Sequence, residues 1–235
     1  MVDRAGATGN AVLDHLEPSL VQKLDPDLRP RDLVLRDVLT ERGEKVEDVF
    51  FVTKGLVSML TTMADGSSVE SGVVGSEGVA GVPAAVGTGR ATHGTAIVQV
   101  PGRALAMAAD RFREMVAEES HLRDLVDRYT NAVLTVATQN VACNRLHPVE
   151  GRASRWLLMT RDRTESDVFP MTHEFLSHML GVRRASVSEA AEQLQERGAI
   201  EYRRGEIRIL DRSRLEASAC ECYAVVSGVF DGLYD

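Results

Sequence analysis

Two pairs of arginines beside glycines stand out in the last third of the chain. Arg183 and Arg184 follow Gly181, and a second pair, Arg203 and Arg204, precedes a glycine at position 205. The guanidinium group is a planar fork of donors that matches phosphate oxygens and the edge of guanine. Two such pairs, each beside a turn, indicate a surface that binds nucleic acid.

The residues around the first pair have the pattern of a helix, a tight turn and a second helix. Thr172 is placed to cap the first helix, and Gly181 can adopt the left-handed conformation that ends it. The second helix turns an apolar face inward, formed by Val187, Ala190, Ala191 and Leu194. Its exposed N-terminal end holds the candidates for base contacts, namely Arg183, Arg184, Ser186, Ser188 and Glu189. We therefore predict a helix-turn-helix, in which Thr172 is primarily a cap and can also meet a phosphate.

The second pair lies in a predicted β-hairpin. Residues 200–209 alternate between apolar and polar side chains on both sides of the glycine at 205. Arg203 and Arg204 lie just before that turn, where they would follow the phosphate backbone and add affinity without much sequence discrimination. The hairpin therefore predicts a wing that accompanies the helix-turn-helix.

The distribution of charge favours this interpretation, although the chain as a whole carries a net charge of −8. Residues 1–144 carry 14 basic and 20 acidic side chains, whereas residues 145–215 carry 13 basic side chains, all arginine, and 11 acidic ones. Phosphate binding requires positive charge at the site and not in the total. The basic segment is the one that contains both arginine pairs.

The first half of the chain has the pattern of a compact all-β barrel or sandwich. Short apolar runs are separated by glycine-containing turns, and the runs cover residues 33–39, 49–52, 56–62, 68–74, 95–100 and 104–107. Asp65–Gly66, between the third and fourth runs, is a strong hairpin signal because both residues tolerate a positive φ.

A long helix is predicted after Asp110, because an aspartate can cap a helix start and no glycine or proline follows until position 148. An apolar stripe runs along it at the spacing of a coiled-coil seam, through Leu122, Val126, Tyr129, Val133, Val136, Asn140 and Cys143. We interpret the stripe as a dimer interface, and the alternative is that it packs on the barrel of its own chain. Asn140 would fix the register of a dimer or face a ligand beside the helix.

His147–Pro148 ends this helix, because proline lacks a backbone donor and disfavours a helical residue before it. A second amphipathic helix follows at 149–160, with Trp156, Leu157 and Met159 as core candidates. We expect an α+β protein of three parts: a β-barrel effector domain at 1–110, a dimerisation helix at 111–146 and a winged helix-turn-helix domain with a C-terminal tail at 147–235.

Over nearly its full length the chain resembles the Crp/Fnr superfamily of bacterial transcription factors. Residues 172–187 are similar to its helix-turn-helix signature, and residues 42–44, 51–57 and 65–66 are similar to its cyclic-nucleotide-binding β-barrel. The resemblance implies a double-stranded β-helix of the jelly-roll kind, a homodimer on a pseudo-palindromic operator, and RNA polymerase as a further partner. Ala185 stands where well-known members have a base-reading glutamate, so their operator sequence is not implied.

The cyclic-nucleotide cassette departs from the family pattern. Members that bind cyclic AMP have Gly-Glu followed by Arg-Ser or Arg-Thr, whereas this chain has Glu77–Gly78 and later Arg90–Ala91–Thr92. We favour a purely structural turn here, and the alternative is that this glycine-rich turn with one arginine cradles a phosphate. We expect no response to cyclic AMP, and the candidate effector pocket consists of Glu77, Gly78, Arg90, Thr92 and Asn140.

No residue spacing indicates a metal, a cofactor or catalysis. Cys143, Cys220 and Cys222 lack a matching histidine cluster, so packed thiols are expected, with redox-responsive thiols at 220 and 222 as the alternative. An iron–sulfur cluster needs about four thiolates, and haem would need an axial ligand such as His93 or His121. Neither a nucleophile–base pair nor a pocket motif with paired carboxylates is present.

The N-terminal residues lack the apolar core of a secretory leader, and no apolar stretch is long enough to span a membrane, so a cytoplasmic protein without a membrane partner is expected. The expected function is that of a sequence-specific DNA-binding transcription regulator. Its expected partners are double-stranded operator DNA, a second copy of the chain and an unidentified small-molecule effector. The alternative is a small-molecule or thiol-redox sensor that acts mainly through protein partners.

Overall fold

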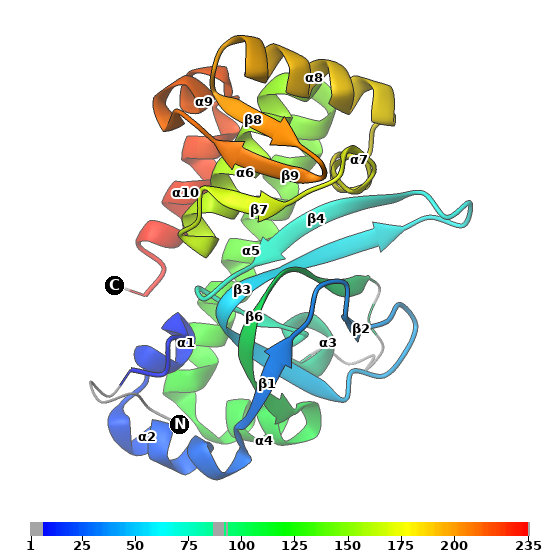
Figure 1. Cartoon of the computed structure of the whole chain (residues 1–235). Coiled ribbons are helices and arrows are strands. Elements are labelled where there is room, and N and C mark those ends of the chain that lie inside the picture. Colours follow the sequence, from blue (N-terminus) through cyan, green and yellow to red (C-terminus); the bar gives the residue numbers. More distant parts are fainter. Residues whose placement is uncertain (1–6, 87–91, 93, 235) are drawn as a thin grey trace. The chain divides into compact units, whose positions relative to one another are not determined.

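The computed structural model describes residues 7–86, 92 and 94–234, and the chain divides into two compact units (Figure 1). The first unit contains Met1–Met59, Gly72–Leu134 and Phe230–Asp235, and the second contains Leu60–Ser71 and Thr135–Val229. The boundaries predicted at residues 110 and 146 do not coincide with this division. Sequence patterns indicate where elements end, but they do not indicate which elements pack together.

A β-sheet forms the centre of the first unit. Its described strands are β1 (Arg29–Leu33), β2 (Val38–Thr40), β3 (Asp48–Thr62), β4 (Ser68–Val74), β5 (Val79–Ala80) and β6 (Thr95–Ala108). The strand order is β1-β6-β3-β4, with β2 also on β6 and β5 also on β3. The pairings of β1 and β2 with β6, and of β5 with β3, are antiparallel. The helices of this part of the chain are α1 (Ala11–Asp14), α2 (Pro18–Leu24), the short 3-10 helix η1 (Asp25–Asp27), α3 (Val82–Val86) and α4 (Ala109–Glu118).

The strands differ from the predicted runs in two ways. The run 33–39 is not one strand, because β1 ends at Leu33 and the chain turns at Arg36, which has a φ of 71°, before β2 begins. The runs on either side of Gly55 join into β3, and those on either side of Gly102 join into β6. A Cβ built on either glycine would overlap backbone atoms of the facing strand, so these glycines permit a close approach of two strands and not a turn.

The predicted hairpin at Asp65–Gly66 is confirmed. The Met63 amide donates to the Ser67 carbonyl oxygen at 2.8 Å, and the Asp65 carboxylate accepts a bond from the Ser67 amide at 2.9 Å. This turn joins β3 to β4, and the outer part of the hairpin, residues 60–71, belongs to the second unit.

The predicted single helix at 111–146 is wrong, because it breaks at Glu119 into α4 and α5 (Ser120–Leu146). Asp110 does not cap α4; its carboxylate accepts a bond from Arg113 at 2.7 Å. Six residues of the stripe on α5 are no more than 6% exposed within the single chain, and Val133 is half-buried. Packing within the chain, the alternative given for this stripe, is therefore the arrangement observed, and the stripe does not offer a free surface to a second copy.

The second unit combines helices with a small antiparallel sheet. Its elements after α5 are α6 (Val149–Thr164), β7 (Val168–Pro170), α7 (His173–Leu180), α8 (Arg184–Glu196), β8 (Ile200–Arg203), β9 (Glu206–Ile209), α9 (Arg212–Ser218) and α10 (Cys222–Asp231). The strand order is β7-β9-β8, and β7 was not predicted. Trp156, Leu157 and Met159 are buried, as predicted. Among the described residues, no helix is both long enough and apolar enough to cross a membrane.

The hairpin segment 60–71 completes the core of the second unit. Leu60 packs against the apolar cluster that contains Trp156 and Leu176. The Trp156 indole donates to the buried Glu70 carboxylate at 3.1 Å, so the buried N–H group is satisfied by a residue from the hairpin. The winged helix-turn-helix therefore packs on a segment that precedes it by about a third of the chain.

Candidate nucleic-acid interface

The helix-turn-helix has the predicted cap and the predicted turn. The Thr172 hydroxyl accepts a bond from the Phe175 amide at 3.1 Å, which satisfies one of the free donors at the start of α7. Gly181 ends α7 with a φ of 60° and a ψ of 43°, in the left-handed region. The next amide, that of Val182, donates to the Ser177 carbonyl oxygen at 3.0 Å, which closes the turn. Helix α8 begins three residues after the glycine, at Arg184.

Helix α8 buries the predicted apolar face and leaves its N-terminal end uncovered. Val187, Ala190, Ala191 and Leu194 are all buried. The remaining candidates differ in accessibility: Arg183, Arg184 and Glu189 are exposed, and Ser186 and Ser188 are half-buried. Arg183 occupies the N-cap position, and its side chain makes no capping bond. The Arg183 guanidinium is therefore not used to cap α8.

Ser188 connects the two helices, because its hydroxyl lies 2.9 Å from the His173 Nδ1 atom. The His173 ring also stacks on Tyr202 of the wing, with ring centroids 4.1 Å apart. Burial, and then the charge of Arg184, lower the pKa of His173 below its ordinary value, so this histidine is neutral near pH 7. His173 and Tyr202 were not predicted as site residues, because nothing in their spacing along the sequence indicates that they stack.

The wing lies beside the start of α7. Its turn residues, Arg204 and Gly205, have φ values of 52° and 81°, as in the type I′ turn that suits a two-residue hairpin. The Gly205 carbonyl oxygen accepts a bond from the Met171 amide at 2.7 Å, and a Cβ built on Gly205 would lie 3.6 Å from the Thr172 methyl group. These contacts join α7, α8 and the wing into one surface. We call it the recognition surface, and it consists of Thr172, Arg183, Arg184, Ser186, Ser188, Glu189, Arg203 and Arg204.

The four arginines of the recognition surface are not neutralised by any acidic side chain that the structure describes. Arg183, Arg184, Arg203 and Arg204 are exposed, and none of them forms an ion pair with a residue that the structure describes. Other arginines of this unit do: Arg197 pairs with Glu150 at 2.5 Å, Arg212 with Asp162 at 2.6 Å, and Arg214 with Asp211 at 3.2 Å. Positive charge is therefore left uncompensated at the start of α8 and at the tip of the wing.

Two family models match this chain in the regions described above. Residues 151–218 match the Crp-like helix-turn-helix domain, and residues 30–119 match the cyclic nucleotide-binding domain. The chain belongs to the Crp/Fnr superfamily. As a Crp/Fnr-type protein it is a DNA-binding transcription regulator.

Known relatives extend the match over most of this Crp/Fnr chain. A CRP-like cAMP-activated global transcriptional regulator of Mycobacterium tuberculosis is 24% identical over 216 residues, which cover 88% of this chain and 96% of the relative. The fold is similar to that of FixK2 from Bradyrhizobium japonicum, with a TM-score of 0.69 and 16% identity over 82% of this chain and 98% of that one. A Crp/Fnr-family regulator from Eubacterium rectale gives a TM-score of 0.71 and 13% identity over 90% of this chain and 98% of that one.

The turn at Gly78, part of the candidate effector pocket of this Crp/Fnr protein, packs against a side chain of its own unit. A Cβ built on Gly78 would overlap the ring of Tyr129, which is buried. The Glu77 carboxylate accepts a bond from the Gly75 amide at 3.2 Å, and the Glu77 carbonyl oxygen accepts a bond from the Tyr234 hydroxyl. The polar groups of this turn are thus satisfied within the first unit.

The two other predicted pocket residues that the structure describes, Thr92 and Asn140, both have hydrogen-bond partners. The Thr92 hydroxyl donates to the Gly94 carbonyl oxygen at 2.9 Å. Asn140 belongs to the second unit, where its amide group donates to the Ser71 carbonyl oxygen at 2.9 Å and its oxygen accepts a bond from Arg155 at 2.5 Å. Arg90 lies outside the described residues.

Two residues that hold the Glu77–Gly78 turn were missed by the sequence analysis. The fully buried Asn10 side chain donates to the carbonyl oxygens of Val52 and Gly78, at 2.8 Å each. Tyr234, besides its bond to Glu77, stacks on His15 with ring centroids 4.9 Å apart. Both residues come from the ends of the chain, where sequence periodicity gives no signal.

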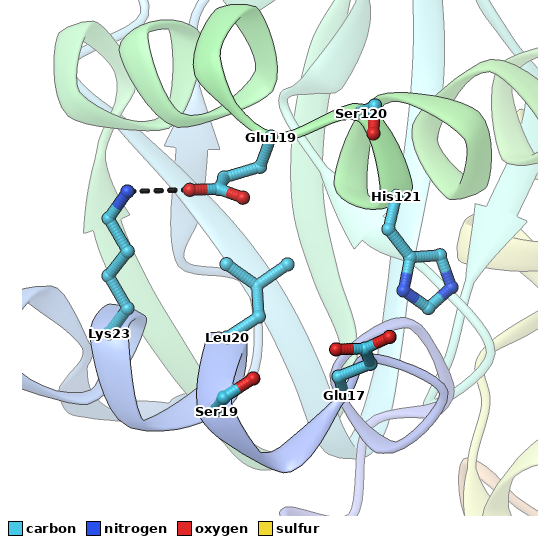
Figure 2. Close-up of a pocket in the computed structure, with 7 residues that line it drawn as sticks. All are labelled: Glu17, Ser19, Leu20, Lys23, Glu119, Ser120 and His121. Carbon is cyan, nitrogen blue, oxygen red and sulfur yellow. Dashed lines mark hydrogen bonds and ion pairs between the residues drawn. The ribbon is translucent and has the colours of Figure 1, made fainter.

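A surface pocket beside α2 has charged side chains that pair with one another (Figure 2). Lys23 bonds to Glu119 at 2.5 Å, and this bond raises the pKa of the lysine. At the other end of the pocket Glu17 and His121 face each other across the opening, with Ser19, Leu20 and Ser120 between the two ends. None of these side chains is a buried polar group without a partner. We therefore do not propose this pocket as a ligand-binding site.

We expect Gly181→Ala to destabilise the second unit by about 1–2 kcal/mol, because an L-residue is strained in the left-handed region. The added Cβ would also lie only 3.0 Å from a Val69 methyl group. Urea unfolding followed by the fluorescence of Trp156, the one tryptophan of the chain, reports on the core of this unit. As a matched control, Gly228→Ala is in a helix with open space around it and should raise stability by about 0.5–1 kcal/mol. Equal effects of the two substitutions would contradict the role of Gly181.

Proposed function

We propose that this chain binds a pseudo-palindromic DNA operator as a homodimer, through the recognition surface, and that it does so without cyclic AMP. The observation that carries the proposal is the set of four exposed arginines that no described acidic residue neutralises, at the start of α8 and the tip of the wing. A surface with this charge binds phosphates and releases their counterions. The recognition surface thus supplies both affinity and a means of reading bases.

Within this proposal the parts of the recognition surface have different tasks. The exposed N-terminal end of α8 enters the major groove, where Arg183 and Arg184 can bind guanine and Glu189 can accept a bond from cytosine. Arg203 and Arg204 follow the phosphate backbone beside the groove. Ser188 acts by position, because its hydroxyl already bonds to His173 and so fixes α8 against α7.

The face of α5 opposite the buried stripe supports a dimer. The residues of this face recur at spacings of four and three and are exposed, namely Asp127, Asn131, Leu134, Thr138, Val141 and Arg145. Leu134 and Val141 are 61% and 73% exposed, although both are apolar. They lie seven residues apart, which places them on the same side of the helix. Regulators of this family usually act as dimers, and two recognition surfaces related by a twofold axis fit a pseudo-palindromic site.

Two observations support independence from cyclic AMP. The Tyr129 ring covers the position that a side chain would take at Gly78, and the Glu77 carboxylate is bonded to its own turn. The sequence also has Arg90–Ala91 where cyclic-AMP-binding members have Arg-Ser or Arg-Thr. The Mycobacterium tuberculosis relative is described as cAMP-activated. Under this proposal the two proteins share a fold but differ in whether cyclic AMP is required.

Removing the arginines should weaken DNA binding in two distinguishable ways. The test uses the tightest-binding fragment selected from a randomised DNA pool and measures affinity at several salt concentrations. Arg203→Gln and Arg204→Gln should each reduce the slope of log affinity against log salt by about 1 and weaken all sequences alike. Arg184→Ala should cost about 1–3 kcal/mol and relax preference at one base-pair position. Arg103→Ala, an exposed arginine of the first unit, is the control and should change nothing; unchanged binding in all three test variants would refute the recognition surface.

Charged residues on the exposed face of α5 should produce monomers. We expect Leu134→Glu and Val141→Glu to dissociate the dimer in analytical ultracentrifugation while the helical circular dichroism is retained. Leu146→Glu is the matched control, because Leu146 is 74% exposed on the same helix but off this face. Substitution of the buried Val136 would instead disrupt the fold. A dimer that persists in both test variants would place the interface elsewhere.

Cyclic AMP at millimolar concentration should not shift the unfolding temperature. A ligand present at about 100 times its Kd would stabilise the folded chain by about 2.7 kcal/mol, so a specific site of even moderate affinity would be visible by calorimetry. Cyclic GMP and AMP serve as controls for non-specific effects. A shift with cyclic AMP alone would overturn this part of the proposal and leave DNA binding untouched.

A further inference from the structure

Three thiols and one imidazole meet in the second unit, away from the recognition surface. Cys143 lies in the last turn of α5, and His147 directly follows that helix. Cys222 is the first residue of α10, and Cys220 lies two residues before it. One ligand atom from each of the four residues lies within 4.8 Å of all the others. The expectation that the thiols lack a matching histidine was wrong, because His147, which ends the long helix with Pro148, lies beside them.

We propose that Cys143, His147, Cys220 and Cys222 bind one Zn²⁺ ion that stabilises the DNA-binding unit. Tetrahedral Zn²⁺ has bonds of about 2.3 Å to sulfur and about 2.0–2.1 Å to nitrogen, which place two sulfurs about 3.8 Å apart and a sulfur and a nitrogen about 3.6 Å apart. The Cys143 and Cys220 sulfurs are 3.6 Å apart, and the Cys222 sulfur is 3.5 Å from the His147 Nδ1 atom. Both distances fit two edges of the same tetrahedron.

The groups around the cluster suit a metal site. The Nε2 atom of His147 lies 3.1 Å from the Glu221 carboxylate, which leaves Nδ1 free to bind the metal. A carboxylate that accepts the second N–H of a ligand histidine is a recurring feature of zinc sites. The Gln139 amide donates to the Cys222 sulfur at 3.0 Å, which supplies a hydrogen bond to a thiolate.

Two buried arginines near the cluster carry positive charge that a negatively charged metal site would offset. Arg152 and Arg155 are each 5% exposed, and neither forms an ion pair with any residue in the described part of the chain. Their bonds go to neutral oxygens, those of Asn144 and Leu180 for Arg152 and that of Asn140 for Arg155. Arg155 lies close enough to Cys143 and Cys220 for their charges to interact. Zn²⁺ with three thiolates and a neutral imidazole has one net negative charge, which would offset this buried positive charge.

The site would hold together elements on which the recognition surface depends. It joins the end of α5 to the start of α10, and the Cys220 amide also donates to the Gly151 carbonyl oxygen of α6 at 3.3 Å. The next residue of α6, Arg152, donates to the Leu180 carbonyl oxygen at the end of α7. The closed set of four protein ligands is that of a structural zinc site, without the open position of a catalytic one.

The first experiment measures metal directly in the full chain, purified without an affinity tag and under a thiol reductant. We expect one zinc per chain by elemental analysis, and loss of that zinc to a strong chelator with a lower unfolding temperature. Refilling with Co²⁺ should give one equivalent of a complex with intense thiolate-to-cobalt absorption and tetrahedral d–d bands, which Zn²⁺ should then displace. Substoichiometric zinc and cobalt without thiolate bands, or a Cys143–Cys220 disulfide that forms in place of the metal site, would overturn the proposal.

The second experiment uses variants with a matched control. His147→Ala and Cys220→Ser, at the two ligands that are only half-buried, should abolish stoichiometric Co²⁺ binding. Glu221→Gln should keep the thiolate bands but weaken metal affinity about 10–100-fold. His178→Ala, an exposed histidine of the same unit, should leave the metal site intact. These readouts do not involve DNA, so a failure of metal binding can be distinguished from a failure of operator binding. Unchanged cobalt spectra in His147→Ala and Cys220→Ser would exclude these two residues as ligands.

Discussion

The chain must pass from α7 to α8 within three residues, and it does so through one residue in the left-handed region, Gly181. The amide that follows this glycine is bonded back to α7, so α8 begins at a fixed point. A fixed start is what keeps Arg183 and Arg184 at an uncovered helix end. The stacking of His173 on Tyr202 and its bond to Ser188 then hold the wing to the same two helices. The geometry of the recognition surface therefore follows from the turn.

Features set by local backbone chemistry could be predicted from the sequence. The Thr172 cap, the Gly181 turn, the Asp65–Gly66 hairpin and the buried face of α8 each depend on residues within a few positions of one another, and all four were confirmed. Strand β7 was missed because it is only three residues long, and β3 and β6 were each divided at a glycine that lies against another strand.

Features set by distant contacts could not be predicted in the same way. An apolar stripe on a helix shows that one face is buried, but the spacing is the same whether the covering surface comes from the same chain or from a second one. The residues of the Cys143–His147–Cys220–Cys222 cluster come from two segments separated by more than 70 positions. Pairing of arginines with acidic residues depends equally on packing, so the sequence showed a basic segment but not which of its arginines remain free.

The contribution of residues 60–71 to the second unit limits its modularity. Glu70 satisfies the buried indole of Trp156, and Val69 lies against the Gly181 turn, yet both residues come from the β3–β4 hairpin. A fragment that begins after Pro148 would contain the whole helix-turn-helix but would lose both contacts, leaving an unsatisfied buried donor and a void. Recombination that exchanged the DNA-binding domain at the helix break would separate the helix-turn-helix from the hairpin segment 60–71 on which it packs. In this protein the hairpin and the recognition helix are therefore expected to be inherited together, and specificity to diverge by substitution on α8 and not by domain exchange.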